Sequence, residues 1–160
     1  MKAFKLALPL ALASLICANA FADPASSNSS TSMQLLGTVA TACTISVTPT
    51  AKSTTLNITG GESSTLVGVV TENCNDGVGY TVTVTSSNLG QLVSTATGST
   101  PTTYTATYDN ATGAINKALT ATRTQAYFAK QGNLAVTFAG NSQAIAGSYS
   151  DNLNIVIAAK

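Results

Sequence analysis

The clearest alternation of apolar and polar residues in the chain covers residues 33–43. On one side of this alternation lie Met33, Leu35, Gly37 and Val39. Polar or small residues lie between them, with Leu36 as the one apolar exception. A period of two is that of a β-strand with one buried face. A glycine inside such a strand indicates that another backbone or a shallow pocket approaches it closely. The pattern predicts a strand, either the first of an ordinary β-sandwich or one with an unusual partner.

Further short stretches with the same period follow along the chain. We expect strands over residues 44–48, 65–74, 80–85, 104–108, 134–138 and 147–159, and the apolar residues also alternate within 53–59. Asn, Asp and Gly, which tolerate tight reversals, separate several of these stretches. The chain therefore reads as a series of strands joined by turns.

Two segments give a weaker signal. Residues 92–103 are rich in Ser and Thr and contain Pro101, which indicates a surface loop with room for a short strand at its start. Residues 115–128 fit a short helix as well as a strand. Because no stretch predicts a long helix, we expect an all-β fold of two packed antiparallel sheets.

The first residues have the layout of a secretory signal peptide. Lys2 and Lys5 precede an apolar run over 6–16, and small residues follow at 18–22. This run is too short for a membrane anchor. We expect residues 1–22 to be removed by cleavage after Ala22, or alternatively after Ala20. Residues 23–41 then form an N-terminal extension that begins with a polar, flexible tail, and residues 42–160 form one domain.

Charge is sparse and nearly balanced. The whole chain carries a formal charge of +1. Without Lys2 and Lys5, acidic residues exceed basic ones by one. No basic stripe is present, so we expect no binding to nucleic acid or to anionic lipid.

Beyond the expected cleavage site the chain has two cysteines, Cys43 and Cys74. In an oxidising compartment the default for such a pair is a disulfide. In the chain-entropy model a bond that closes a loop of this length stabilises the fold by roughly 3 to 4 kcal/mol. A metal site would need more ligands, and the chain has no histidine. We therefore expect no metal and no cofactor.

Residues that support catalysis are missing from the sequence. Without histidine the chain lacks the commonest general base. The carboxylates are scattered among turns, and neither a Gly-x-Ser-x-Gly motif nor a glycine-rich phosphate loop is present. We expect a protein that is not an enzyme and that works by contact, for which exposed strand edges are the natural surfaces.

Three features in this order resemble the chaperone-usher pilus (fimbrial) subunits of Gram-negative bacteria. They are Met33-x-Leu-x-Gly-x-Val followed by Cys43, then Cys74 at the end of an apolar strand, then the ending Gly147-Ser-Tyr-Ser-Asp-Asn-Leu-x-Ile-x-Ile157. The Gly-x-Tyr-x-Asp part of that ending is closest to the archaic branch, which includes spore coat protein U-like domains. The resemblance covers essentially all of the chain beyond the expected signal peptide.

The resemblance implies an incomplete immunoglobulin-like antiparallel β-sandwich that lacks its last strand. In this family the N-terminal extension of the next subunit fills the resulting groove as a donor strand. The donor residues would be Met33, Leu35, Gly37 and Val39. The acceptor groove would be lined by Tyr149, Leu153, Ile155 and Ile157. The implied partners are neighbouring subunits in a homopolymer, a periplasmic chaperone and an outer-membrane usher.

The leading hypothesis is thus a structural pilus subunit, exported through the periplasm to the cell surface, that polymerises by donor-strand exchange and supports adhesion or biofilm formation. One alternative is a fimbrial adhesin that binds a host or surface receptor. Another is a complete, monomeric, secreted β-sandwich in which residues 33–39 pair within their own chain.

Overall fold

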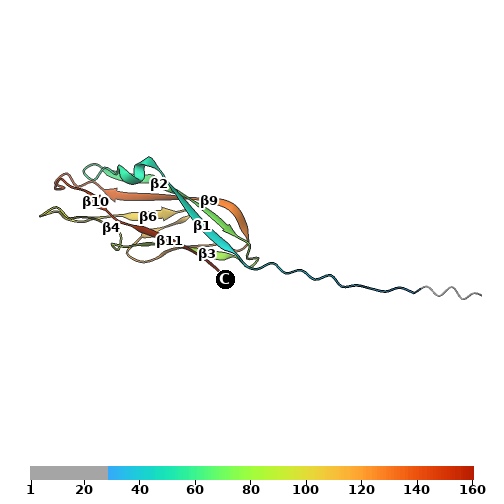
Figure 1. Cartoon of the computed structure of the whole chain (residues 1–160). Helices are drawn as coiled ribbons and strands as arrows, with labels where there is room; N and C mark the ends of the chain where they lie inside the picture. Colours follow the sequence, from blue (N-terminus) through green and yellow to red (C-terminus); the bar gives the residue numbers. More distant parts are fainter. Residues whose placement is uncertain (1–28) are drawn as a thin grey trace, which may run out of the picture. The chain divides into compact units, whose positions relative to one another are not determined.

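The computed structural model of the chain describes residues 29–160 (Figure 1). Residues 38–160 form one compact unit, and the described residues 29–37 belong to a second unit. The expected signal peptide, 1–22, and the start of the expected extension lie outside the described residues. The compact unit is all-β with antiparallel sheets, which confirms the expected fold class at this level.

The strands are short, apart from two long ones that form the centre of the largest sheet. In chain order the elements are β1 (Cys43–Pro49), the 3₁₀-helix η1 (Ala51–Thr54), β2 (Gly61–Cys74), β3 (Tyr80–Ser86), β4 (Gln91–Ser94), β5 (Thr102–Thr103), β6 (Thr105–Tyr108), β7 (Ala111–Ala114), β8 (Leu119–Thr122), β9 (Tyr127–Ala139), β10 (Tyr149–Ser150) and β11 (Leu153–Ala159). Pro49, which has no backbone N–H to donate to a ladder, is the last residue of β1.

The strands form one five-stranded sheet, in the order β1-β2-β9-β6-β7, and two three-stranded sheets, β11-β3-β8 and β10-β4-β5. Alternate side chains of the five-stranded sheet meet those of the facing strands in one apolar core. Val70 of β2 and Val136 of β9 contribute from the five-stranded sheet, and Val82 and Val84 of β3 contribute from the facing sheet. The period of two that was visible in the sequence is therefore the period of burial.

The segments with weak sequence signals are resolved by the structure. Residues 115–128 contain β8 and the start of β9, and no helix. Residues 92–103 begin with the end of β4 and finish with β5, and the residues between these strands are irregular. Residues 53–59 contain the end of η1 and no strand. Residues 29–42 form no strand, although 33–43 show the clearest alternation, so β1 begins only at Cys43.

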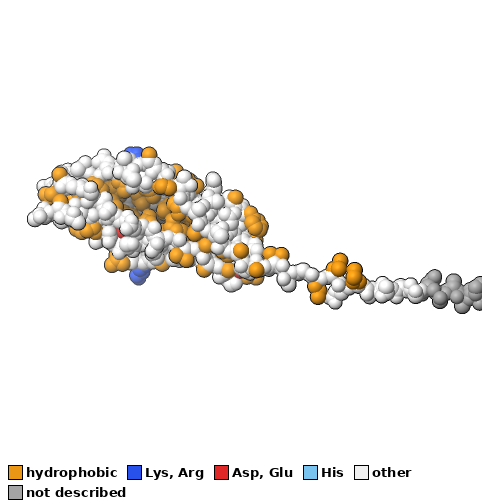
Figure 2. Space-filling view, in the orientation of Figure 1, with side chains coloured by type: hydrophobic (Ala, Val, Ile, Leu, Met, Phe, Trp, Pro, Cys, Tyr) orange, Lys and Arg blue, Asp and Glu red, His pale blue; other side chains and the backbone are white. Residues whose placement is uncertain are grey.

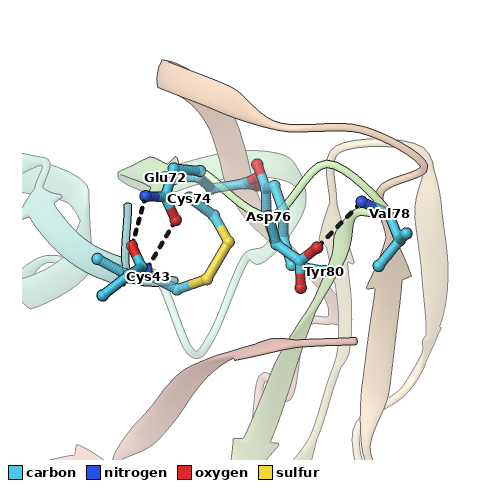
Figure 3. Close-up of a disulfide and its surroundings, with 9 residues drawn as sticks. Cys43, Glu72, Cys74, Asp76, Val78 and Tyr80 are labelled. Atoms are coloured by element: carbon cyan, nitrogen blue, oxygen red, sulfur yellow. Dashed lines mark hydrogen bonds between the residues drawn. A yellow bond between two sulfur atoms is a disulfide. The ribbon is translucent and has the colours of Figure 1, made fainter. Parts of the chain in front are cut away.

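The disulfide between Cys43 and Cys74 is confirmed, and Figure 3 shows it at the start of β1. The two cysteines occupy directly opposite positions of β1 and β2, with their Cα atoms 4.1 Å apart. The bond therefore fixes the first residue of β1 to the last residue of β2.

Candidate functional site

Among residues 29–160, β1 and β11 are edge strands of two different sheets. Strand β1 pairs only with β2, and β11 pairs only with β3. The two strands approach each other in the fold but form no ladder with one another. Each therefore presents a row of backbone N–H and C=O groups that another strand can pair with.

Between these two edges lies an apolar groove with a volume of about 670 Å³. Figure 2 shows it as an extended patch of hydrophobic surface in the hollow between the two layers. The apolar residues that line the groove come from both layers and are Val47, Leu56, Ile58, Val67, Leu92, Tyr104, Leu134, Val136, Tyr149, Leu153 and Ile155. This lining favours an uncharged, apolar occupant.

Side chains that face the groove from its two walls are incompletely covered. On β11, the groove-lining Leu153 and Ile155 are half-buried while Asn154 between them is exposed. On β1 the inward-facing Val47 is 45% exposed. Apolar side chains on the inner face of a closed two-layer core are normally buried, so this end of the core lacks a covering strand.

The residues before β11 shape one end of the groove. The Tyr149 hydroxyl donates to the Ile145 carbonyl oxygen at 3.0 Å, which holds the tyrosine ring against the loop. Gly147 lies so close to β4 that a Cβ there would be 2.9 Å from the Ser94 Oγ. A side chain at this position would therefore push the end of the groove out of place.

Asp151 is the only charged residue among those that line the groove. Its carboxylate accepts hydrogen bonds from the Ser86 hydroxyl, the Tyr104 hydroxyl at 2.6 Å, and the backbone N–H groups of Asn88 and Asn152 at 3.0 and 2.7 Å. Burial, together with the hydrogen bond to this carboxylate, raises the pKa of Tyr104. Because four hydrogen bonds already occupy the Asp151 carboxylate, this residue fixes the backbone and side chains at the groove end.

The N-terminal segment exposes apolar side chains that would suit such a groove. The side chains of Met33, Leu35 and Val39 are 81, 82 and 89% exposed, and no atom outside the neighbouring residues lies within 4 Å of a Cβ built on Gly37. A row of exposed apolar side chains with a period of two is unusual in a soluble chain and marks an interaction surface.

A separate polar cluster lies in the core around Glu72, which is fully buried. The carboxylate accepts hydrogen bonds from the hydroxyls of Tyr80 and Tyr108 and a two-point hydrogen bond from the Arg123 guanidinium, at 2.9 and 2.7 Å. Arg123 also pairs with Asp109 at 3.0 Å. This cluster ties the end of β2 to β3, β6 and the residue after β8.

Burial alone would raise the pKa of Glu72, but the hydrogen bonds from Arg123, Tyr108 and Tyr80 outweigh it and lower the pKa to about 2. The hydrogen bond to Glu72 correspondingly raises the pKa of Arg123. Burial and then the Glu72 carboxylate raise the pKa of both Tyr80 and Tyr108. Each group is thus held in one protonation state, which suits a structural role.

The part of the chain that the structure describes has no group of three or more His, Cys, Asp or Glu side chains placed to hold a metal ion. Within the same residues no helix has the length and apolar character needed to cross a membrane.

The structure brings together three of the four residues expected to line an acceptor groove, since Tyr149, Leu153 and Ile155 all line it. Ile157 lies further along β11 and packs against the core without lining the groove. Sequence reasoning missed the opposite wall and the floor, which include Val47, Leu56, Leu92, Tyr104, Leu134 and Val136. Several of these lie at alternating positions, but alternation does not tell which inward residues stay uncovered.

Comparison of the chain with protein-family models, with curated proteins and with solved structures gave no match. The groove and the N-terminal segment are therefore the features of the chain that indicate a function.

Proposed function

We propose that the chain is a structural subunit of a surface pilus, and that residues 33–39 of one copy fill the groove of the next by donor-strand exchange. The observation that carries the proposal is that one chain has both an apolar groove and an exposed apolar segment that could fill it. The groove has an apolar lining between two unpaired strand edges, and the N-terminal segment has an exposed apolar face of strand period. Strand addition to an exposed edge is a recurrent way of recognising an extended segment.

The lengths of the two parts agree. Strands β1 and β11 each have seven residues, and the alternating segment 33–39 also has seven. At about 3.3 Å per residue, a strand of this length extends over roughly 23 Å. One donor segment therefore has the same length as each of the two strands beside the groove.

The donor strand should run antiparallel to β11. Strands β1 and β11 run in opposite directions, so a strand between them is antiparallel to one and parallel to the other. Strand β11 contributes Leu153 and Ile155 to the groove lining and β1 contributes only Val47, so we place the antiparallel ladder, which is slightly more stable per residue, on β11. In this orientation Val39 lies near Leu153 and the groove end, and Met33 lies near the end of β11. Gly37 then passes close to the groove wall, where a side chain would meet a shallow part of the lining.

The finer fold class follows from the same proposal. With a donor strand between β11 and β1, the two layers would form a complete immunoglobulin-like β-sandwich, of which a single copy lacks the last strand. Until the groove is filled, the exposed edges of β1 and β11 favour aggregation. A periplasmic chaperone and an outer-membrane usher are the partners that would protect the subunit and add it to the fibre at the cell surface.

The test uses the mature chain and a synthetic peptide of residues 30–41. A peptide at about 100 times its Kd stabilises the folded state by about 2.7 kcal/mol, which corresponds to a rise in Tm on the order of 10 °C for a domain of this size. We expect such a rise by calorimetry because the peptide covers the apolar groove and pairs both edges.

The matched control is the same peptide with Gly37→Asn, which should raise Tm far less because the added side chain meets the groove wall. An unchanged Tm with the unmodified peptide, together with a monodisperse and thermostable monomer in gel filtration, would instead support a complete, monomeric, secreted β-sandwich.

A further inference from the structure

The residues that connect the donor segment to the domain are fixed to the domain surface. The Asn75 side chain accepts a hydrogen bond from the Ala42 N–H at 2.7 Å and donates one to the Ala40 carbonyl oxygen at 2.8 Å. The Asn75 N–H also donates to the Ala42 carbonyl oxygen at 3.2 Å. The backbone of residues 40–42 therefore follows the domain and does not act as a flexible linker.

If one copy fills the groove of the next, as the proposed function requires, the fixed backbone of residues 40–42 brings the two domains into contact. The donor segment ends at Val39, and the fixed backbone begins at residue 40. Consecutive Cα atoms are 3.8 Å apart. The domain that supplies the donor strand must therefore touch the rim of the groove that receives it, since no free residues separate the two domains.

The surface around the start of β1 presents apolar side chains at this point. Val78 lies in the turn between β2 and β3 and is 66% exposed, and in Figure 3 its side chain points away from the disulfide. Phe128 is 73% exposed. It neighbours Tyr127, which pairs with Cys74 across the ladder, so it lies at the same end of the domain. We call Val78 and Phe128 the exit surface.

The backbone holds Phe128 in this exposed position. The following residue, Ala129, has a φ of +52°, a conformation that is unfavourable for a residue with a side chain. The Asn73 side chain accepts a hydrogen bond from the Ala129 N–H at 2.7 Å, which supports that conformation. Such local strain persists only where the surrounding structure enforces it.

Apolar side chains are also exposed at the opposite end of the domain, on the rim of the groove near Tyr149. Leu89 and Ile145 are both exposed. Ile145 is tied to Tyr149 by the hydrogen bond at its carbonyl oxygen, and the neighbour of Leu89, Asn88, donates to the Ser150 carbonyl oxygen at 3.2 Å. Both residues therefore lie beside the segment that shapes the groove end. We call Leu89 and Ile145 the rim surface.

We infer that the exit surface of one copy docks on the rim surface of the copy whose groove it fills, as a second contact between neighbouring subunits. The donor strand antiparallel to β11 places Val39 at the rim, and the Asn75 hydrogen bonds bring the exit surface to the same place. The contact is heterologous, because the two surfaces are different, and it repeats along an open fibre when the rotation between copies does not close a ring. Its occupant is a second copy of this chain.

The first measurement compares fibres with peptide binding. In the double variant Val78→Ser, Phe128→Ser, the peptide of residues 30–41 should raise Tm as much as in the wild type, because the groove is unchanged. Fibres of this variant should fail to form or should dissociate in warm detergent at least about tenfold faster, since a loss of 1.4 kcal/mol corresponds to a factor of ten. The matched control is Leu66→Ser on the outer face of β2. Fibres of this control variant should dissociate at the wild-type rate.

The second measurement is thiol cross-linking in assembled fibres. Chains that carry both Phe128→Cys and Ile145→Cys, treated with a short bismaleimide and boiled in detergent, should give covalent dimers and larger ladders. Chains with Leu66→Cys and Ile145→Cys should give monomers.

The outcomes separate this inference from the proposed function. Fibres of the double serine variant that are as stable as wild-type fibres, or the absence of cross-links between positions 128 and 145 in normal fibres, would overturn the second contact alone. A wild-type chain that neither binds the peptide nor forms fibres would overturn the proposed function and this inference with it.

Discussion

Glu72 is the single residue on which most of the buried polar contacts in the core converge. A buried carboxylate is costly unless it is paired and hydrogen-bonded, and here Arg123, Tyr80 and Tyr108 provide those partners. Gly132 makes room for the Tyr108 ring, because a Cβ at that position would lie 2.8 Å from the ring. The only trace of this cluster in the sequence is an acidic residue at an inward-facing position of β2, between Val70 and Cys74.

Replacing Glu72 with glutamine should lower the free energy of unfolding and reduce its dependence on pH in the acid range. The folded state holds the pKa of Glu72 at about 2, below the ordinary value of 4.5. The stabilisation from this carboxylate is therefore complete above pH 4.5 and is lost as pH falls toward 2. Glu72→Gln leaves Arg123 without its main partner, which should cost about 3 to 5 kcal/mol at neutral pH. Urea unfolding between pH 2 and 7 measures both effects.

The matched control for this experiment is Asp76→Asn, which keeps a side-chain oxygen for the hydrogen bond from the Val78 N–H. It should retain the loss of stability between pH 4.5 and 2, because the Glu72 cluster is intact. A Glu72→Gln variant with the acid response of the wild type would show that the buried carboxylate does not stabilise the fold.

At the scale of elements, β1 is the least supported wall of the groove. It is an edge strand that pairs only with β2 among the described residues, and its inward-facing Val47 is partly exposed. The disulfide fixes its first residue, Cys43, to Cys74. The bond therefore stabilises one wall of the groove as well as the fold.

Replacing Cys43 with serine should lower stability by about 2 to 5 kcal/mol and, on the proposed function, reduce the amount of the chain recovered from the periplasm. Because only the backbone ladder then holds β1 to β2, this wall of the groove is less fixed and the peptide of residues 30–41 should also bind more weakly. Calorimetry and peptide titration measure the two effects, and Cys43→Ser, Cys74→Ser controls for the unpaired thiol. An unchanged Tm and yield would argue against a stabilising role for the disulfide.

At the scale of the whole molecule, one chain carries both an extended apolar segment and a groove of matching length. A contact between different surfaces of identical copies extends into a fibre unless the rotation closes it into a ring. On the proposed function, the segment would act as donor and the groove as acceptor.

Deleting residues 26–39 should separate these roles. The shortened chain keeps the groove, so it should accept a wild-type donor and show the same rise in Tm with the peptide. It should not extend a fibre, and adding it to wild-type chains should shorten fibres in electron micrographs in proportion to its amount. The control deletion, 26–31, removes only polar residues and should leave fibre length unchanged. Fibres of normal length from the 26–39 deletion alone would contradict the assignment of the donor segment.

Most of the strands were predictable because their period of two is local. Residues 65–74, 80–85 and 134–138 all fall within strands at the expected positions. The alternation within 53–59 has another cause, because Leu56 and Ile58 line the groove from an irregular segment after η1. Residues 33–43 show the limit of the method, since a strand pattern records which side chains are apolar but not which chain they pair with.

The sequence by itself determined the all-β class, the cysteine pair and the apolar ending at Tyr149, Leu153 and Ile155. Each depends on residue types and on spacing along the chain. Only the tertiary structure decided that β1 and β11 keep unpaired edges, that the space between them is an apolar groove, and that Glu72 meets Arg123. These features depend on the order of strands in the sheets, which brings residues distant in sequence together and which no local pattern specifies.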